Sequence, residues 1–391
     1  MKNKFKLFSL LSGAIFVLAI TACGTNDQPA TYENNPPSTP VENEVVESGS
    51  KVNVALIAHS PDSILDDQSF NQGAWDGITR FGRTHGLVAD ETMRFFQPHA
   101  ASDEARLDLI EEAINTGANI LVLPGFHFES ALYDAQDLFP DTKFILLDAT
   151  PSRVEMDGDE RIVHTRIEPN VAAIHYAEEE AGFLAGYAAV MEGYRNLGFM
   201  GGIAVPAVVR FGHGFIQGAD YAAAALELSE GDVTIEFMYL GAFAPNPEFQ
   251  TTAASWYELM DVEVIFVAAG GAGSMIKAAA EASGRSVIGV DVDQSGLSNQ
   301  VITSAVKGLD VSVYDLLTDF HNDNWNGGRE IRFNAAVDGV GLPKHNSRFQ
   351  NFTQEQYDTI FERLAKNDIR VNDSLLRDNI ETNLVTVNEH N

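Results

Sequence analysis

The chain alternates between short runs of apolar residues and longer stretches whose apolar residues recur at three- and four-residue intervals. The continuous runs predict strands buried on both faces. They span Val52–His59, Asn119–Pro124, Lys143–Asp148, Asn196–Met200, Val233–Leu240, Val262–Ala268 and Ser286–Val290. The helical spacing predicts amphipathic helices. These cover Ser69–His85, Asp103–Thr116, Ile174–Met191, Gly214–Leu228, Glu248–Met260 and Ser274–Ser283.

This alternation of strand and helix is typical of the α/β class. It favours right-handed crossovers and parallel sheets covered by helices on both faces. The pattern occurs once up to about residue 160 and again up to about residue 288. We therefore expect two doubly wound lobes, each built around its own parallel sheet.

The N-terminal residues have the order of an export signal. Three lysines, at positions 2, 4 and 6, precede an apolar run over residues 7–20, which ends in Ile20-Thr21-Ala22-Cys23. The run is shorter than the roughly 20 residues that a membrane-spanning helix needs. Small residues before a cysteine resemble a bacterial lipobox, so we expect residues 1–22 to be removed and Cys23 to be acylated. The alternative is an ordinary signal peptide with an incidental cysteine.

The segment after Cys23 has the composition of a hydrated tether. Residues 24–50 contain four prolines and neither lysine nor arginine, which favours an extended chain over a packed one. Folding should begin near Lys51. Because Cys23 is the only cysteine, no internal disulfide can form and the fold must depend on its apolar core.

The charge excludes one class of partner. The chain has a formal net charge of −31, and the part after residue 22, which lacks three lysines, carries −34. Nucleic acids and anionic lipid surfaces are poor partners for such a body, because binding phosphates requires clustered lysine and arginine. Membrane contact is therefore expected through the lipid anchor alone.

Candidate binding residues follow the predicted strands. In open parallel sheets, ligands bind outside the carboxyl ends of the strands. The residues at these positions, or at the start of the first helix, are His59, Asp66, Asp67, Phe70, Asn71, Gly125, Phe126, Asp148, Phe243, Gly270, Gly271, Asp291 and Asp293. Few of them are strong nucleophiles or bases.

One segment carries a recognisable motif. Residues 66–77 read DDQSFNQGAWDG, and DDxSFN followed by a helix resembles the basic membrane protein family of solute receptors. Residues 144–149, 266–273, 287–294 and 304–307 are similar to later segments of that family. The resemblance covers roughly residues 52–340.

The resemblance implies a type I periplasmic binding protein fold, in which three crossings join two α/β lobes and the ligand cleft lies between them. We expect residues 51–160 and about 290–325 to form the first lobe, and residues 161–289 and about 326–391 to form the second. The better-studied receptors of this family bind purine nucleosides for an ABC importer. The implied partners are therefore a nucleoside and an ABC permease, for a monomer on the extracytoplasmic face of the cell membrane.

The resemblance also implies residue roles. Phe70 and Phe243 would sandwich the base, and stacking contributes roughly 1 to 3 kcal/mol per base. Asp148 and Asp291 would accept hydrogen bonds from ribose hydroxyls. Each role has an alternative, since Phe70 could instead pack the start of its helix and a strand-end aspartate could cap a helix.

Three further polar residues have two interpretations each. Asp67 and Asp293 are equally compatible with helix capping and with ligand contact. Asn71 would either orient the motif loop or read the base edge.

Lys307 would compensate the carboxylates and donate to the sugar, or else be a solvated surface lysine. A site with several carboxylates and one lysine repels phosphate, which favours a nucleoside over a nucleotide.

His59 departs from the family pattern. At the end of the first strand, purine-binding relatives are expected to have an aspartate that faces the base. A neutral imidazole donates with one nitrogen and accepts with the other. His59 can therefore still read a purine edge, with a different preference, and the base stays open.

Enzyme classes find little support. The glycines at 270–273 lack a following GKS or GKT and do not match GxGxxG, which argues against nucleotide hydrolysis and dinucleotide binding. Acids at 62, 66 and 67 do not match the DxDxGxDD of nucleoside hydrolases, and the histidines have no zinc spacing. We expect a binding protein without cofactor or metal; a sensory lipoprotein with the same fold is the alternative.

Overall fold

The computed structural model describes residues 51–158 and 160–390. The expected signal peptide (1–22), the lipidation site Cys23 and the tether up to residue 50 lie outside these residues. None of the helices in the described part combines the length and the apolar character needed to cross a membrane.

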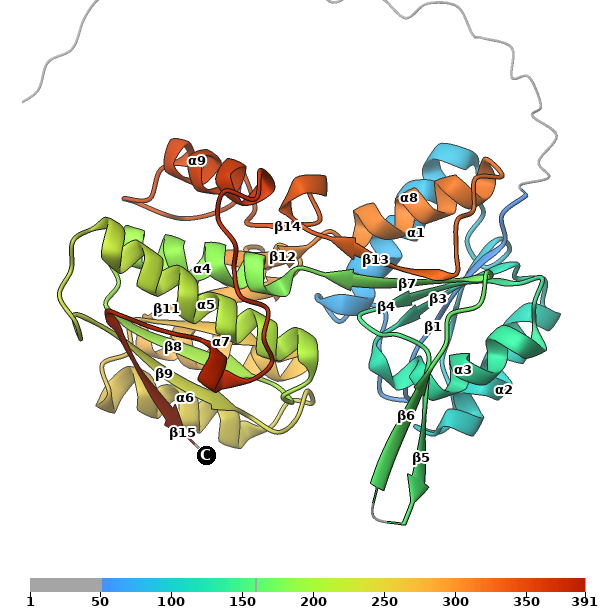
Figure 1. Ribbon diagram of the computed structural model, residues 1–391, viewed down its shortest axis with the longest axis horizontal. Helices are drawn as coiled ribbons and strands as arrows, with labels where there is room; N and C mark the ends of the chain where they lie inside the picture. The colour runs from blue at the N-terminus through green and yellow to red at the C-terminus, as the bar shows by residue number, and fades with distance from the viewer. Residues whose placement is uncertain (1–50, 159, 391) are drawn as a thin grey trace, which may run out of the picture. The chain divides into compact units, whose positions relative to one another are not determined.

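The first lobe is built on a parallel sheet of six strands in the order β13-β7-β4-β3-β1-β2 (Figure 1). Its strands are β1 (Val54–Ile57), β2 (Met93–Phe96), β3 (Ile120–Pro124), β4 (Lys143–Leu147), β7 (Val171–Tyr176) and β13 (Arg329–Phe333). Helices α1 (Phe70–His85) and α8 (Leu309–His321) cover one face, and α2 (Asp103–Asn115) and α3 (Glu129–Leu138) cover the other (Figure 1). β1, β3 and nearly all of β4 are buried, as apolar strands between two helical layers should be.

The second lobe contains a sheet of seven strands in the order β14-β12-β11-β10-β8-β9-β15, parallel except where β14 pairs with β12. Its strands are β8 (Asn196–Gly201), β9 (Val233–Tyr239), β10 (Val264–Ala268), β11 (Ser286–Asp291), β12 (Val301–Lys307), β14 (Val340–Gly341) and β15 (Val385–His390). Four helices flank it, namely α4 (Glu178–Glu192), α5 (Pro206–Ala225), α6 (Pro247–Leu259) and α7 (Gly273–Ser283), and α9 (Gln354–Ala365) contacts α4. The predicted α/β class with two doubly wound lobes is confirmed.

Shorter elements complete the described chain. An antiparallel hairpin of β5 (Ser152–Asp157) and β6 (Glu160–Thr165) extends away from the first sheet (Figure 1). Three short 3-10 helices follow strands, namely η1 (Phe126–Phe128), η2 (Gly270–Ala272) and η3 (Ala335–Val337), and a fourth, η4 (Arg377–Asn379), precedes β15.

Strand pairing differs from the expected lobe boundaries. The expected ranges assigned β7 and β13 to the second lobe and β12 to the first, whereas β7 and β13 pair within the first sheet and β12 pairs with β11 in the second. The predicted helix at Ile174–Met191 also begins too early. Residues 174–176 end β7, because the backbone of this alanine-rich run pairs with β4 and β13. The chain passes between the sheets after β7, β12 and β13.

Helices α4 and α5 pack with their backbones in contact through glycines at positions 182, 186, 214 and 218. A Cβ atom added at Gly218 would lie 1.9 Å from the Phe183 carbonyl oxygen, and one at Gly186 would lie 2.1 Å from the Phe215 carbonyl oxygen. No side chain fits at that distance. This close approach brings Arg210 of α5 beside Glu178 at the start of α4.

Gly218→Ala should therefore destabilise the fold by about 1–3 kcal/mol or more, because the added methyl group overpacks the α4–α5 contact. At an unhindered helix position, the same change would stabilise by about 1 kcal/mol. Gly296→Ala is the control, because Gly296 has no atom within 4 Å of the added Cβ. Urea unfolding measures both. An unchanged or raised free energy of unfolding for Gly218→Ala would contradict the packing.

Candidate functional site

The centre of the candidate site is the ammonium group of Lys307, at the carboxyl end of β12. It contacts the Asp148 carboxylate and lies 3.4 Å from Glu178 Oε1 and 3.8 Å from Asp291 Oδ1. Asp148 follows β4 of the first sheet, and Asp291 ends β11 of the second. The carboxyl ends of strands from both lobes thus bring their acids to one lysine, whose side chain is only 3% exposed.

Burial and mutual attraction set the charges of this cluster. Burial alone would lower the pKa of Lys307, but its three carboxylates outweigh burial and raise that pKa, so Lys307 stays an ammonium. Burial raises the pKa of Asp148 to about 7, although Lys307 opposes the shift. Burial also acts to raise the pKa of Glu178, but Lys307 and Arg210 hold it below its ordinary value.

The two strand-end aspartates have unusual backbone conformations. Asp148 has φ = 57° and Asp291 has φ = 66°, in the left-handed region that aspartate adopts more readily than most residues. The buried Oδ1 atom of Asp148 accepts no hydrogen bond from the described residues. The cluster therefore retains an acceptor that a hydroxyl group can use.

Aromatic rings surround the same ammonium. Lys307 Nζ lies 5.0 Å from the ring centroid of Phe70, 5.2 Å from that of Phe211 and 5.5 Å from that of Tyr176. Phe70, in the first turn of α1, is half-buried and also packs against the core. A Cβ added at Gly125 would lie 3.9 Å from the Phe70 ring. The Phe70 ring thus packs against the core and also lies beside the cluster of Lys307 and its acids.

The loop before α1 is held by Asp67 and Asn71. Asp67 accepts hydrogen bonds from the amides of Ser69, Asn71 and Gln72 at 2.9–3.0 Å, so it caps α1. The buried Asn71 donates to the Ile64 carbonyl at 3.1 Å, which corresponds to the loop-orienting role. Asp66, in contrast, is exposed.

Ser69 is a site residue that the sequence analysis missed. Its hydroxyl donates to Asp291 Oδ2 at 2.6 Å, which links the start of α1 in the first lobe to β11 in the second. The Gln294 side chain makes a second link between the lobes, because it donates to the Gln68 carbonyl at 2.9 Å. In the sequence, the only indication of the Ser69–Asp291 contact is that a serine lies within the DDQSFN segment.

Phe243, Gly270 and Gly271 come together in the second lobe. A Cβ at Gly270 would lie 3.6 Å from the Phe243 ring, and one at Gly271 would lie 3.3 Å from the Phe243 carbonyl oxygen. That carbonyl accepts the Ala272 amide at 2.7 Å. The half-buried ring is therefore held against the start of η2.

Asp293 belongs to a local turn. It is exposed and accepts hydrogen bonds from the Ser295 amide at 3.0 Å and from the Asn346 side chain at 2.6 Å. No helix begins in the described residues between β11 and β12, so Asp293 caps a turn and not the predicted helix; its contact with a ligand stays a prediction.

His59 lies in a row of rings at the carboxyl end of β1. Its ring stacks on that of His127 with centroids 4.5 Å apart, and the His127 ring is tilted against Phe126 at 4.0 Å. Burial, followed by the positive fields of His127 and Arg106, lowers the pKa of His59 to about 4. His59 is thus a neutral imidazole near pH 7. His127, which directly follows Gly125-Phe126, was not anticipated.

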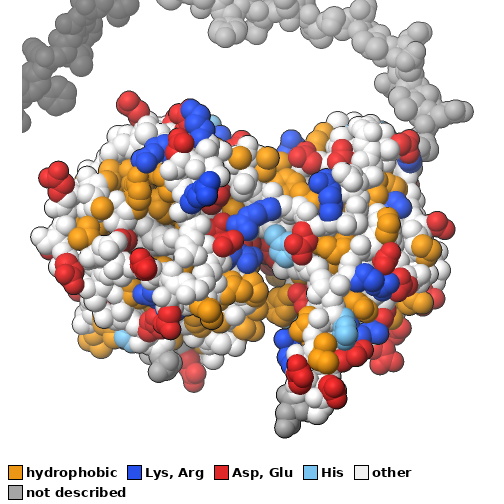
Figure 2. Space-filling view, viewed as in Figure 1, with side chains coloured by type: hydrophobic (Ala, Val, Ile, Leu, Met, Phe, Trp, Pro, Cys, Tyr) orange, Lys and Arg blue, Asp and Glu red, His pale blue; other side chains and the backbone are white. Residues whose placement is uncertain are grey.

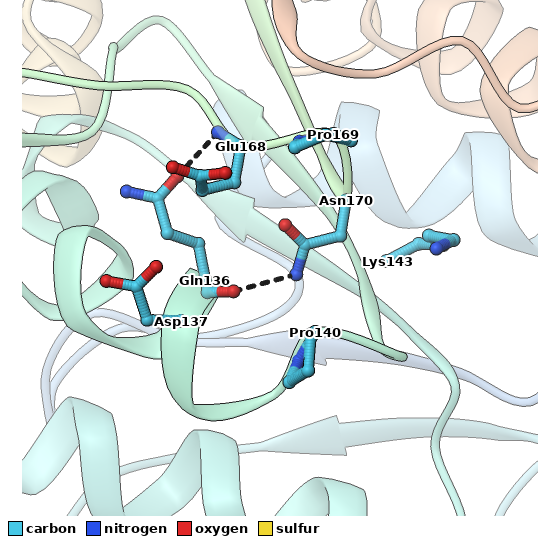
Figure 3. Close-up of a pocket in the computed structure, with 7 residues that line it drawn as sticks. All are labelled: Gln136, Asp137, Pro140, Lys143, Glu168, Pro169 and Asn170. Carbon is cyan, nitrogen blue, oxygen red and sulfur yellow. Dashed lines mark hydrogen bonds between the residues drawn. The ribbon is translucent and has the colours of Figure 1, made fainter.

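Two hollows lie in the first lobe. One of about 430 Å³ is next to the histidine row and is lined by Arg106, Phe126, His127 and Arg153, among others. The second, of about 260 Å³, contains Lys143 at the amino end of β4 (Figure 3). There Gln136 accepts the Glu168 amide at 2.9 Å and Asn170 donates to the Gln136 carbonyl at 3.1 Å (Figure 3). These bonds join its lining residues to one another, and the pocket lies at the edge of the sheet opposite the ion cluster.

Three consecutive acids at the start of α4 connect the lobes and were also missed. Glu178 accepts from Arg210 Nε at 2.7 Å and faces Lys307, and Glu179 pairs with Arg332 of β13. Glu180 accepts the amide of Ala335 at 2.7 Å, beyond β13. Figure 2 shows positive, negative and histidine side chains gathered where the two halves of the displayed face meet. The acids at 178–180 thus contact residues next to the crossings that follow β12 and β13.

The described residues contain no cluster of three or more histidine, cysteine, aspartate or glutamate side chains arranged to hold a metal ion. The acids around Lys307 instead share that lysine, and Glu178 also pairs with Arg210. What they offer a ligand is hydrogen-bond acceptors around one donor, next to an aromatic ring.

Residues 51–374 match a family described as "ABC transporter substrate-binding protein PnrA-like". The ABC transporter nucleoside-binding protein BmpA of Lactococcus lactis is 28% identical over 302 residues, which cover 72% of this chain and 79% of BmpA. Basic membrane protein A1 of Borrelia garinii is 29% identical over 79% of this chain and 86% of that protein.

Solved structures are similar in fold. A solute-binding protein of an ABC transporter system from Aeropyrum pernix superposes with a TM-score of 0.63 at 22% identity, covering 82% of this chain and 87% of that one. A counterpart from Conexibacter woesei gives a TM-score of 0.62 at 20% identity, with 82% and 99% covered.

Lys307→Met should cost about 3–5 kcal/mol of folding free energy, because removing one partner leaves buried carboxylates without a counter-charge. Burial acts to raise the pKa values of Asp148 and Glu178, and Lys307 opposes both shifts. Without Lys307, both acids bind protons at a higher pH than they do in the parent. Lowering the pH from about 8 to about 5 should therefore shrink the deficit. Urea unfolding at the two pH values measures it.

Lys344→Met is the matched control. The Lys344 side chain is 55% exposed and 3.9 Å from Asp338, and its replacement should change stability by about 0.5 kcal/mol or less. Equal costs for the two variants, or a Lys307→Met deficit that grows at low pH, would contradict the description of the cluster.

Proposed function

Because the chain belongs to the family of PnrA-like ABC transporter substrate-binding proteins, as its DDQSFN segment predicted, we propose that it captures a purine nucleoside between its lobes. A protein of this class has a small-molecule ligand and a permease partner. The proposed ligand is released unchanged to the permease. The L. lactis relative, named as a nucleoside-binding protein, supports this choice.

One observation carries the proposal, namely the arrangement of Asp148 and Asp291 around Lys307 beside the Phe70 ring. Ribose hydroxyls donate to carboxylates and accept from an ammonium, so this cluster is complementary to a sugar with neighbouring hydroxyls. The Phe70 ring offers a flat apolar surface for a base. A nucleoside combines both chemical features in one molecule.

The second lobe contributes the other aromatic surface. Phe243 is held against Gly270 at the start of η2, and we propose that hinge closure brings it onto the opposite side of the base. The closed state is then favoured by contacts that exist only with ligand present. Gly125, Phe126 and Gly271 shape the walls, whereas Asp67 and Asn71 act by holding the α1 loop.

The charges and protonation states of the site limit the choice of ligand further. Phosphate would meet three carboxylates around a single ammonium, which disfavours nucleotides. His59, with its lowered pKa, is neutral; the Ser63 hydroxyl engages one of its ring nitrogens at 3.0 Å, so the other nitrogen is left to donate to or accept from the base edge. A purine edge has both kinds of partner.

Capture without chemistry is the proposed activity. The acids near Lys307 are bound to that lysine, to Arg210 or to Ser69, and we propose that they serve the solute as hydrogen-bond acceptors. We further propose that the chain acts as a monomer. An acyl group on Cys23 and the tether that follows would hold it at the extracytoplasmic face of the membrane, close to its permease.

Phe70→Ala should weaken purine nucleoside binding by roughly 5- to 150-fold, because it removes about 1–3 kcal/mol of base stacking. Isothermal titration calorimetry of the chain from Cys23 onward, with inosine, guanosine and adenosine, measures the change. Chromatography of the recovered solute shows whether it stays intact.

Phe139→Ala is the control, because this half-buried ring packs against the first-lobe core at the end of α3. It should lower stability and leave affinity unchanged. Equal nucleoside affinities for Phe70→Ala and the parent would remove Phe70 from the site. Absence of nucleoside binding by the parent protein would refute the proposed ligand class.

A further inference from the structure

Lys277 occupies an unusual position on α7. The buried residues of this helix are Gly273, Ile276, Lys277, Ala279 and Ala280, so a lysine interrupts the apolar stripe that covers the second sheet. Lys277 is only 8% exposed. Lysine is almost never buried to this extent unless it is paired.

The ammonium of Lys277 has no such pair. Within residues 51–158 and 160–390, it makes no hydrogen bond or ion pair, and Asp291 is the one charged group with a resolved effect on its pKa. Burial lowers that pKa to about 8, although Asp291 opposes the shift. Lys307 differs, because its three carboxylates raise its pKa. Lys277 therefore has donor capacity that the protein itself does not use.

The local geometry shows where this donor lies. Side chains on a helix lean toward its amino end, and a Cβ added at Gly273, one turn earlier, would lie 3.3 Å from Lys277 Nζ. The ammonium is thus beside the first turn of α7, directly after the Gly270-Gly271 segment that holds Phe243. The amino end of a helix is its positive end and repels a cation. A buried ammonium there calls for an electron-rich partner.

We propose that Lys277 is a specificity-determining residue that donates a hydrogen bond to a sugar hydroxyl of the bound solute, on the second-lobe side of the cleft. This proposal rests on nucleoside capture as the function. A hydroxyl oxygen accepts from an ammonium while its hydrogen donates to a carboxylate. Lys277 and Asp291 can therefore bind one hydroxyl together, as Lys307 and Asp148 can bind another. The two lysine–aspartate pairs make the site selective for neighbouring hydroxyl groups.

The test compares the parent chain with Lys277→Met, which keeps the length and removes the charge. Calorimetric titrations use inosine and its 2′-deoxy, 3′-deoxy and 5′-deoxy analogues. The variant should bind inosine about 10- to 100-fold more weakly, as expected for loss of a hydrogen bond from a charged donor. One deoxy analogue, which lacks the contacted hydroxyl, should bind both proteins with affinities within about twofold.

The possible results distinguish a failure of the proposed Lys277 role from a failure of nucleoside capture. If the parent binds inosine and the variant binds it equally well, or loses the same factor for all four solutes, Lys277 contacts no hydroxyl. If the parent binds none of them, nucleoside capture and the role of Lys277 both fail. Lys344→Met controls for loss of a surface charge. Lys277→Leu, which also lacks a donor, replaces the methionine variant if that variant does not fold, and is judged by the same pattern.

Discussion

The structure depends on one buried cation, because Lys307 is the counter-charge for acids that arrive from both lobes. Asp148 and Asp291 end strands of different sheets, and Glu178 begins the helix that follows the first crossing. Without the lysine, three buried carboxylates would repel one another in a region from which water is largely excluded. The left-handed backbone at both aspartates is consistent with side chains directed at this centre.

Packing beside the cluster keeps its members in place. The glycine contact between α4 and α5 places Arg210 against Glu178. Glu178 therefore pairs with a second cation besides Lys307. Glu179 and Glu180 bond to Arg332 and to the Ala335 amide. The same short segment thus contributes one acid to the site and bonds to β13 and to the residues after it. These bonds connect the charged groups of the site to the segment that joins the lobes after β13.

The sequence predicted those strands whose apolar pattern has only one structural interpretation. β3, β4, β10 and β11 are continuous apolar runs, and they were predicted within two residues at each end. β7 was missed in part because its alanines also fit a helical pattern, and pairing with β4 and β13 decides its conformation.

Among the site residues, pattern placed Asp148 and Asp291 at strand ends and the family resemblance supplied Lys307; the three converge in the structure. The pattern could not distinguish Asp66 from Asp67, because only backbone geometry determines which of two adjacent carboxylates reaches the helix amides. The sequence also failed to predict the roles of Ser69, Lys277 and the acids at 178–180. Burial of a polar side chain depends on tertiary neighbours that periodicity does not reveal.

The central claim is that the chain selects an intact nucleoside. The most direct measurement incubates the chain from Cys23 onward with an equimolar mixture of purine nucleosides, their bases, their monophosphates and free pentoses. Unbound solutes are then removed, and the solutes released on denaturation are identified by mass spectrometry. The account predicts a purine nucleoside with its glycosidic bond intact. Retention of a pentose, a free base or a nucleotide in its place, or of nothing, would contradict it.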